Sequence, residues 1–332
     1  MKAWISREAG GPESLVLQER PVPGLGARDV LVEVRAVGVN FPDGLLIRDK
    51  YQIKPPRPFV PGSEFCGVVA EIGTEVTRFK PGDVVAGGSG WGALSEYIVM
   101  AERHLFRIPS SFPVDEAAAF LFAYATAYHA LHDVGRVRAG ETLVVLGAAG
   151  GVGSAAVEVG RALGAHVIAA ASTREKVDFA RARGAANGLV YDAHLTSGEG
   201  QKELAGRLKT LAPAGVHAVV DPVGGPYTEP ALRSLARGGR HLVVGFTAGI
   251  PSIPLNIALI RGRQILGVDW YTFVQVEPEA NEHNVDALFD LWRSGDIRPL
   301  VTERFPFTAA PDAIERLDTR QATGKVVVSL RP

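Results

Sequence analysis

A glycine-rich turn, GAAGGVG at residues 147–153, lies between an apolar run at 143–146 and an amphipathic segment that ends at Gly164. A strand, a glycine turn and a helix in this order form half of a βαβ unit. Gly150 and Gly151 would let backbone N–H groups approach a ligand closely, and the dipole of the following helix would favour a negative charge there. The pattern therefore predicts a dinucleotide site, with the pyrophosphate at the start of that helix.

The residues after the next expected strand, 166–171, indicate which dinucleotide would bind. An NAD site carries an acidic residue about 20 residues after the glycine turn, where it bonds the ribose 2′-hydroxyl. Here the stretch AHVIAAASTREK (165–176) has no acid before Glu175, and Ser172, Arg174 and Lys176 occupy the region. Ser172 and Glu175 also fit a helix-capping pattern, with the cations simply solvated. Because two cations in a first helical turn oppose the helix dipole, we favour a bound 2′-phosphate and therefore NADPH.

The composition excludes several other classes of protein. The 332 residues are 46% hydrophobic and 21% charged, as in globular proteins, and their number favours two domains. A net charge of -1 gives no field that would attract nucleic acid or an anionic membrane. No apolar run spans a bilayer, and charges interrupt the N-terminus before a signal sequence develops. The single cysteine, Cys66, allows no internal disulfide and predicts a cytoplasmic protein.

The elements that must position these residues fall into two regions. Residues 1 to about 120 contain short β-rich runs punctuated by Gly, Pro and Asp. After an Ala-rich helical stretch from 115, apolar strands alternate with helices, which is typical of a parallel sheet covered on both faces. The expected strands are 142–147, 166–171, 188–192, 216–221, 240–246 and 264–269. The expected helices are 152–163, 174–183, 199–211, 226–236 and 255–260.

Six such strands predict a complete doubly wound Rossmann sheet. A helix after residue 270 and two late strands, RFPF and KVVVSL, are expected to return to the first region. We therefore predict an α/β protein, with a β-rich domain of residues 1–122 and 270–332 and a Rossmann domain of residues 123–269.

Six motifs together resemble those of the medium-chain dehydrogenase/reductase superfamily, in particular its zeta-crystallin-like NADPH:quinone oxidoreductase family. They are AVGVNFPD (36–43), PGSEFCGVV (61–69), FKPGDVV (79–85), EAAAF (116–120), GAAGGVG (147–153) and DPVGG (221–225). The resemblance covers essentially the whole chain. It implies a GroES-like catalytic domain split around the cofactor domain, with the substrate in the cleft between them. It also implies hydride transfer from NADPH to a quinone or another α,β-unsaturated carbonyl, and a homodimer that pairs the edge strand near 264–269.

Zinc-dependent members of the superfamily differ from this chain at two positions. They place a Cys where Asn40 stands and a His where Ser63 stands, beside Glu64. Without a thiolate or an imidazole at these positions, a catalytic zinc would lack its nitrogen and sulfur ligands. A structural zinc would need four cysteines, and the chain has one. We therefore predict that no metal is bound.

The resemblance also implies which residues surround the cofactor. Asn40 and Thr126 would lie near the nicotinamide. The pyrophosphate would be covered by Ala149, Gly150, Gly151 and Val152. The adenosine 2′-phosphate would be surrounded by Ser172, Lys176, Tyr191 and Arg320. The nicotinamide side would be lined by Gly245, Phe246 and Thr247, with Trp270 just beyond on the last strand.

One departure from the family affects the acceptor. Quinone reductases of the family often carry a Tyr five residues after the Asn, where this chain reads Gly44-Leu45-Leu46. Tyr51 matches a second family tyrosine, so Asn40 and Tyr51 are the predicted catalytic residues. Loss of the first phenol makes the pocket more apolar and leaves the acceptor open. An enoyl or acryloyl thioester reductase on the same scaffold, or a non-catalytic NADPH-binding protein of the crystallin type, remain alternatives.

Overall fold

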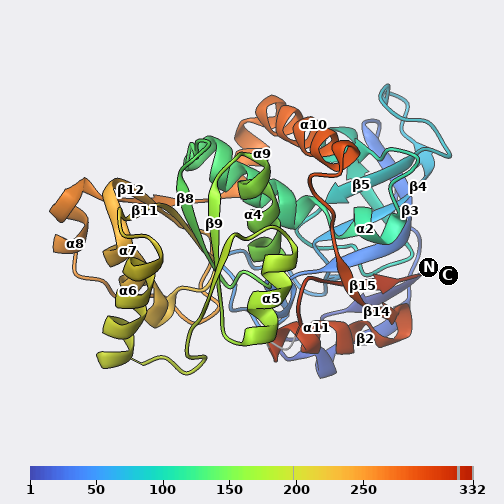
Figure 1. The fold of residues 1–332 in the computed structure, drawn as a ribbon. Coiled ribbons are helices and arrows are strands. Elements are labelled where there is room, and N and C mark those ends of the chain that lie inside the picture. The colour runs from blue at the N-terminus through green and yellow to red at the C-terminus, as the bar shows by residue number, and fades with distance from the viewer. Residues whose placement is uncertain (197, 320–321, 331–332) are drawn as a thin grey trace. The chain divides into compact units, whose positions relative to one another are not determined.

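The chain folds into two compact units. The first unit contains residues 1–122 and 299–332, and the second contains residues 123–298. The computed structural model describes residues 1–196, 198–319 and 322–330 (Figure 1). Across these described residues, no helix is both long enough and apolar enough to cross a membrane.

The second unit is built on a parallel sheet of six strands. Its strands are β8 (Thr142–Leu146), β9 (His166–Ala171), β10 (Asn187–Val190), β11 (Val216–Asp221), β12 (Leu235–Val243) and β13 (Gln264–Gly267). Their order across the sheet is β10-β9-β8-β11-β12-β13, and every neighbouring pair is parallel. This is the doubly wound order 3-2-1-4-5-6, so the predicted Rossmann sheet is confirmed.

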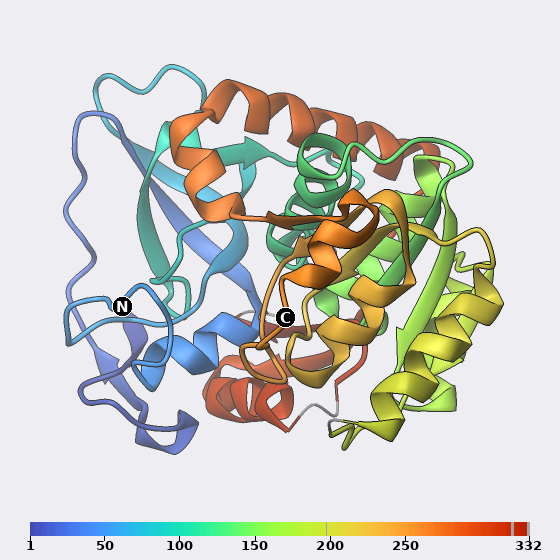
Figure 2. The ribbon, with the colours of Figure 1, turned by 90° about the vertical axis from the view of Figure 1, so that its left-hand side faces the viewer.

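Helices cover both faces of this sheet because its strands are apolar on both sides. They are α4 (Gly151–Ala162), α5 (Arg174–Ala182), α6 (Glu199–Leu211), α7 (Thr228–Ser234) and α8 (Asn256–Leu259), with 3-10 turns at Gly225–Tyr227 and Ile260–Gly262. α4 and α5 lie on one side of the sheet, and α6 and α7 lie on the other (Figures 1 and 2). The central valines Val144, Val145, Val219 and Val220 are fully buried between these layers.

The segment 270–298 differs from the expected domain division. The sequence predicts it in the β-rich domain, but it clusters with the second unit. Its helices α9 (Trp270–Val276) and α10 (Pro278–Ser294) are held there by side chains. The ring of Phe273 stacks on His129 with centroids 4.0 Å apart, and the Asn284 amide donates a 2.7 Å hydrogen bond to Asp133. These contacts correct the predicted boundary at residue 270.

The Ala-rich stretch predicted as a helix from residue 115 is interrupted. It forms α2 (Val114–Ala118) and α3 (Thr126–Tyr128), with π-helical turns at Leu121–Ala125 and His129–Val134. The backbone N–H of Phe122 donates to the Glu64 carboxylate at 2.9 Å. Because this donor is used by a side chain from elsewhere in the first unit, the regular helical ladder is broken at that point.

The first unit is mostly β-structure, as predicted. Its strands are β1 (Lys2–Ile5), β2 (Val16–Glu19), β3 (Asp29–Val39), β4 (Glu64–Ile72), β5 (Val84–Gly88), β6 (Tyr97–Ala101), β7 (Leu105–Arg107), β14 (Val301–Pro306) and β15 (Lys325–Ser329). Its remaining helices are α1 (Phe41–Ile47) and α11 (Ala310–Asp318), with 3-10 turns at Pro12–Ser14, Glu102–His104 and Phe307–Ala309. β1 pairs with β2, and the other strands form a seven-stranded sheet in the order β14-β15-β3-β4-β5-β7, with β6 on β3. The late strands β14 and β15 thus return to this unit.

Gly153 in α4 provides a test of why the turn contains glycines. A Cβ atom at Gly153 would overlap the carbonyl oxygen of Gly147, whereas a Cβ at Gly206 in α6 would meet nothing within 4 Å. We expect Gly153→Ala to lower the free energy of unfolding by about 1–3 kcal/mol through overpacking. The control Gly206→Ala should raise it by about 0.5–1 kcal/mol through helix propensity. Urea titrations measure both, and equal effects of the two variants would contradict the close-approach argument.

Candidate functional site

Three strand ends of the first unit bring polar side chains together. Asn40 follows the end of β3 and caps α1, and Glu64 begins β4 opposite Gly38 of β3. Lys325 begins β15, whose next residue pairs with Val39 on the other side of β3. A Cβ atom at Gly38 would overlap the carbonyl oxygen of Ala118 and lie 2.6 Å from the Glu64 carboxylate, so glycine is required there.

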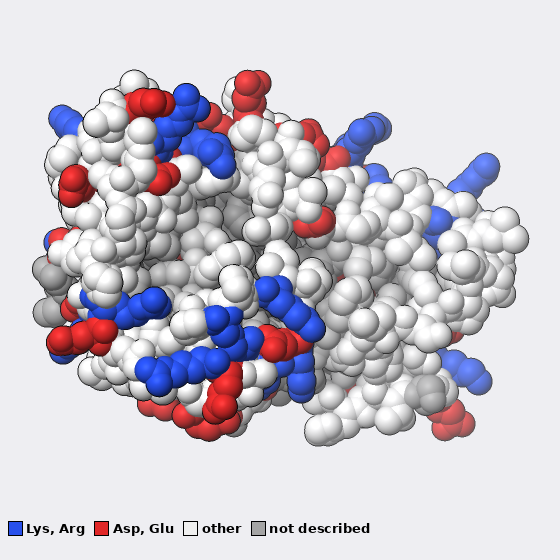
Figure 3. Space-filling view, turned by 180° about the vertical axis from the view of Figure 1, so that it is seen from behind, with Lys and Arg blue, Asp and Glu red and all other residues white. Residues whose placement is uncertain are grey.

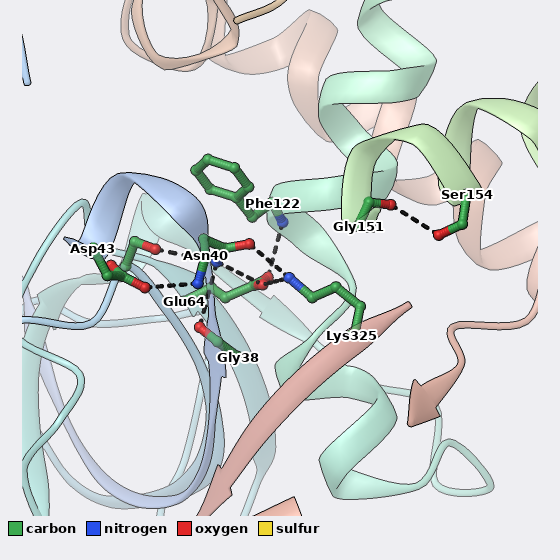
Figure 4. Close-up of polar contacts among 9 residues, drawn as sticks. Gly38, Asn40, Asp43, Glu64, Phe122, Gly151, Ser154 and Lys325 are labelled. Carbon is green, nitrogen blue, oxygen red and sulfur yellow. Dashed lines mark hydrogen bonds and ion pairs between the residues drawn. The ribbon is translucent and has the colours of Figure 1, made fainter. Parts of the chain in front are cut away.

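The side chains of Asn40, Glu64 and Lys325 form a closed triangle of hydrogen bonds (Figure 4). The Lys325 ammonium donates to Asn40 Oδ1 at 2.6 Å and to Glu64 Oε1 at 2.7 Å. Asn40 Nδ2 donates to Glu64 Oε1 at 2.9 Å and approaches Ser63 Oγ at 3.2 Å. All four side chains are buried. The second oxygen of Glu64 accepts the Phe122 N–H, so this buried carboxylate is paired at both ends.

Asp43 adds a second acid beside this triangle. It lies in the first turn of α1, is 1% exposed, and accepts the backbone N–H of Asn40 at 2.8 Å. Burial raises the pKa of Asp43 to about 7, the Asn40 N–H and the Ser63 hydroxyl offset part of that rise, and the nearby Glu64 charge adds to it. The carboxyl group of Asp43 therefore titrates near neutral pH, inside the folded unit.

The glycine turn of the second unit has the shape that the sequence predicts. Gly147 has a φ of +59°, which favours glycine, and Gly150 caps α4 from an exposed position. The first N–H groups of α4, which include those of Gly151 and Val152, have no acceptor within the helix. Ala149, in the turn before α4, is buried. A phosphate fits here because these donors and the helix dipole both favour an anion.

The start of α5 places two cations at the carboxyl end of β9. Arg174 and Lys176 both lie in the first turn, where Arg174 is exposed and burial lowers the pKa of Lys176. The helix cap is Thr173 rather than the expected Ser172, because Thr173 Oγ1 accepts the Lys176 N–H at 3.2 Å. Ser172 is therefore not needed as a cap and stays half-buried between the strand and the helix.

Tyr191 lies beside this helix start. It follows β10, and its N–H donates to the carbonyl of Ala171 at 2.9 Å, which brings it next to Ser172. Its ring packs against Tyr227 with centroids 4.7 Å apart. Ser172, Arg174, Lys176 and Tyr191 are thus gathered at one edge of the sheet. Arg320, the remaining residue predicted there, lies outside the described residues.

The predicted nicotinamide-side residues follow β12 at the same edge. The Gly245 N–H donates to the Asp221 carbonyl at 3.2 Å, and Thr247 Oγ1 donates to the Pro222 carbonyl at 3.3 Å. Phe246 is 45% exposed and lines a small apolar pocket of about 200 Å³. Thr126 is buried in α3.

Trp270 requires a correction. The sequence places it on the last strand of the sheet, but it begins α9, because Asp269 caps that helix by accepting the Thr272 N–H at 3.1 Å. Its indole N–H donates to Asn281 of α10 at 3.1 Å. Tyr51, in the first unit, is half-buried and packs against the apolar core. Its catalytic role stays a prediction.

Sequence comparison finds two known families along this chain. Residues 26–110 match the alcohol dehydrogenase GroES-like domain, and residues 151–286 match the zinc-binding dehydrogenase family. Quinone oxidoreductase-like protein 2 of Rattus norvegicus is 34% identical, over 99% of this chain and 97% of its own length. The chain belongs to the quinone oxidoreductase family of medium-chain dehydrogenase/reductases.

Solved structures of quinone oxidoreductases agree with this assignment. The enzyme of Thermus thermophilus, known alone and with NADPH, is 35% identical with a TM-score of 0.83, covering 99% of this chain and 100% of that one. The Escherichia coli quinone oxidoreductase complexed with NADPH is 26% identical with a TM-score of 0.89, over 99% and 100% of the two chains. The GroES-like domain joined to a Rossmann domain is therefore confirmed.

Asn40 of the buried triangle and its neighbour Ser63 stand where the resemblance places the zinc ligands of related dehydrogenases. Asn40 and Ser63 replace the two ligands that the resemblance assigns to zinc enzymes, and the Lys325 ammonium lies 2.6 Å from Asn40. In the described part of the chain, no three His, Cys, Asp or Glu side chains are grouped as metal ligands. Burial raises the pKa of the Cys66 thiol to about 12, so it stays protonated. Zinc independence of this quinone oxidoreductase family member stays a prediction.

Several polar residues at these sites are missed by sequence reasoning. Lys325 stands before three valines and reads as an ordinary strand residue, and its partners lie 261 and 285 residues away. Asp221 stands out only as part of a motif. Its carboxylate accepts the N–H groups of Val223 and Gly224, the Thr228 hydroxyl, and His241 Nε2 at 3.0 Å. Burial alone would raise the pKa of Asp221, but the hydrogen bond and charge of His241 bring it below the usual value.

The raised pKa of Asp43 predicts a pH dependence of stability. Between pH 3.8, the ordinary value, and about 7, the folded unit keeps the Asp43 proton while the unfolded chain loses it. The free energy of unfolding should therefore fall with rising pH through this window and level off above it, by about 4 kcal/mol in total. Asp43→Asn removes the titration and keeps an acceptor for the Asn40 N–H. Urea titrations across the window should show the wild type losing stability relative to this variant. A constant difference would contradict a raised pKa.

Proposed function

We propose that this protein is an NADPH-dependent, zinc-independent oxidoreductase that transfers a hydride to a quinone or another α,β-unsaturated carbonyl. The observation that carries the proposal is the pair of cations at the start of α5, beside a glycine turn that opens α4. Both features lie in a chain that is 35% identical to a quinone oxidoreductase known with NADPH.

The cofactor is NADPH, and the residues of the second unit fit it. The N–H groups at the start of α4 would hold the pyrophosphate, because they are free of intrahelical acceptors and lie at the positive end of the helix. Arg174 and Lys176 would neutralise the 2′-phosphate, with Ser172 and Tyr191 beside them. A phosphate there would also remove the conflict between two cations and the α5 dipole. Burial lowers the pKa of Lys176, so a nearby anion would stabilise its charged form.

The bound nicotinamide supplies the hydride, and the protein supplies position and hydrogen bonds. We propose that Gly245, Phe246, Thr247 and Thr126 line its ring, and that Asn40 orients the ring or the acceptor. The loop at 245–247 is fixed to the end of β11 by its bonds to Asp221 and Pro222, so it offers a rigid wall. Tyr51 is the proposed hydrogen-bond donor to the oxygen that gains charge as the hydride is added.

The side chains around Asn40 support zinc independence because they already include a cation. A cation, Lys325, already neutralises Glu64 and donates a hydrogen bond to the Asn40 carbonyl oxygen. A divalent ion at this position would have to displace that ammonium. The cytoplasm stays the predicted location.

We also propose a homodimer that pairs through β13. This strand is the last in the order of the Rossmann sheet, and Ile265 on it is exposed. Leu255, Leu259 and Ile260 in and beside α8 are exposed as well, with Leu259 at 82%. On the face shown in Figure 3, the part of the second unit that carries α8 has few charged side chains. An exposed apolar edge of this kind is typical of a protein interface.

Charge reversal at α5 tests the cofactor. Arg174→Glu/Lys176→Glu should weaken NADPH binding by about 100-fold and leave NADH binding nearly unchanged, because two charge-assisted contacts to the phosphate are lost. Lys202→Glu/Lys209→Glu on α6 changes the net charge equally and serves as control. Titration calorimetry measures both affinities. Equal affinity of the wild type for NADPH and NADH would contradict the proposal.

An acceptor screen tests the reaction. The wild type should consume NADPH with a quinone or an enone and contain no stoichiometric zinc by elemental analysis. Tyr51→Phe should slow quinone reduction by less than about tenfold, because the aromatic product anion is stable enough to be protonated later by water. It should slow enone reduction by about 100-fold, because the more basic enolate gains more from a positioned donor. Tyr97→Phe, a half-buried tyrosine of β6, is the matched control. NADPH oxidation reports the rates.

The outcomes of the screen separate the alternatives. Preference for an enoyl thioester would indicate a thioester reductase. Absence of turnover with every acceptor would favour a non-catalytic NADPH-binding protein. One zinc per chain would overturn the metal-free mechanism.

A further inference from the structure

Lys325 is a buried cation in an otherwise apolar strand. It is 3% exposed and precedes Val326, Val327 and Val328, which are fully buried. Hydride transfer as proposed above does not require it. Burying an ammonium is costly unless it is paired, and a buried pair adds little net stability compared with apolar side chains. A gain in stability therefore does not explain why Lys325 is buried in contact with Asn40 and Glu64, which points to another role.

Lys325 and Glu64 together can select one orientation of the Asn40 side-chain amide. The two ends of an asparagine amide have nearly the same shape but opposite hydrogen-bonding character. An ammonium only donates, so it selects the oxygen end, and a carboxylate only accepts, so it selects the nitrogen end. Lys325 lies 2.6 Å from Oδ1 and Glu64 lies 2.9 Å from Nδ2. A flipped amide would face a donor with a donor and an acceptor with an acceptor.

The side chains of Lys325 and Glu64 are themselves held in place. Lys325 and Glu64 are joined at 2.7 Å, and Glu64 is held at its other oxygen by the Phe122 N–H. Lys325 is carried by β15 and Glu64 by β4, on opposite sides of β3. The amide is thus held between two charges on a rigid sheet, in a buried setting where charge-assisted hydrogen bonds are strong.

We propose that Lys325 is a positioning residue, which together with Glu64 locks the Asn40 amide in one orientation for the reaction. This inference rests on the proposed function, because Asn40 is the residue that would meet the nicotinamide or the acceptor. Lys325 acts through Asn40, and its proposed role requires no contact with the nicotinamide or with the acceptor.

The test removes the charges in two steps. Lys325→Met leaves Glu64 buried without its cation, so its unfolding midpoint in urea should fall. Lys325→Met/Glu64→Gln balances the charges again and should regain most of that midpoint. The double variant lacks both selecting charges, because the glutamine amide introduced in place of Glu64 can offer either end. Its kcat should stay about 10–100-fold below that of the wild type, since misorientation at a reacting centre has effects of this size, while the affinity for NADPH is retained.

A second readout does not depend on turnover. The Asn40 side-chain N–H signals, assigned in a ¹⁵N spectrum by their loss in Asn40→Asp, should exchange slowly with solvent in the wild type. They should lose this protection in Lys325→Met/Glu64→Gln. Arg183→Met/Glu158→Gln is the matched control, since it neutralises another buried ion pair, of 2.8 Å, in the second unit. It should leave the Asn40 signals and kcat unchanged.

The results distinguish this inference from the proposed function. Wild-type kcat together with wild-type protection in the stabilised double variant would overturn the positioning role and leave Lys325 a structural residue. Lost protection with a lowered kcat supports it. If the wild type turned over no acceptor while protection was still lost in the double variant, the proposed function would fail and the amide lock alone would stand.

Discussion

The pairing of β15 with β3 is the constraint on which the candidate site depends. It brings Lys325 beside Asn40, although 285 residues separate them along the chain. On the other side of β3, β4 brings Glu64 to the same point. Neither contact is local, so the buried triangle forms only when β4 and β15 have both paired with β3. The amide of Asn40 is then surrounded by groups that satisfy both of its ends.

The second unit positions its candidate residues mainly through the main chain. Its parallel sheet places the carboxyl ends of β8, β9, β11 and β12 at one edge, so the loops after them meet there. Backbone bonds join these loops: the Ala148 N–H donates to the Ala170 carbonyl, and the Ala248 N–H to the Val223 carbonyl. Asp221 adds a buried acceptor that holds the turn at 223–224. The edge is therefore ordered by main-chain contacts, while the side chains of Arg174 and Phe246 remain exposed to meet a ligand.

The sequence predicts the Rossmann sheet well because periodicity and glycine turns are local signals. All six strands of that sheet are expected from the sequence, and α6 occupies the predicted residues 199–211. The predictions that failed concern features that depend on long-range contacts or on a single hydrogen bond. The segment 270–298 joins the second unit through Phe273 and Asn284, whose partners lie before residue 134. Thr173 caps α5 although Ser172 fits the same pattern one residue earlier. Periodicity also cannot show that Lys325, before three valines, points at two buried partners.

The division of the first unit into two separate stretches of chain has a consequence for synthesis on the ribosome. Residues 36–39 of β3 pair with β15, which is made only after the whole second unit has been translated. Until then this edge of β3 is an apolar strand with open hydrogen-bonding groups, which is the kind of surface that recruits other chains. The Rossmann unit is contiguous and can fold as soon as it emerges, whereas the β-rich unit has to wait. Association with other chains through the open edge of β3 therefore competes with folding until β15 pairs there.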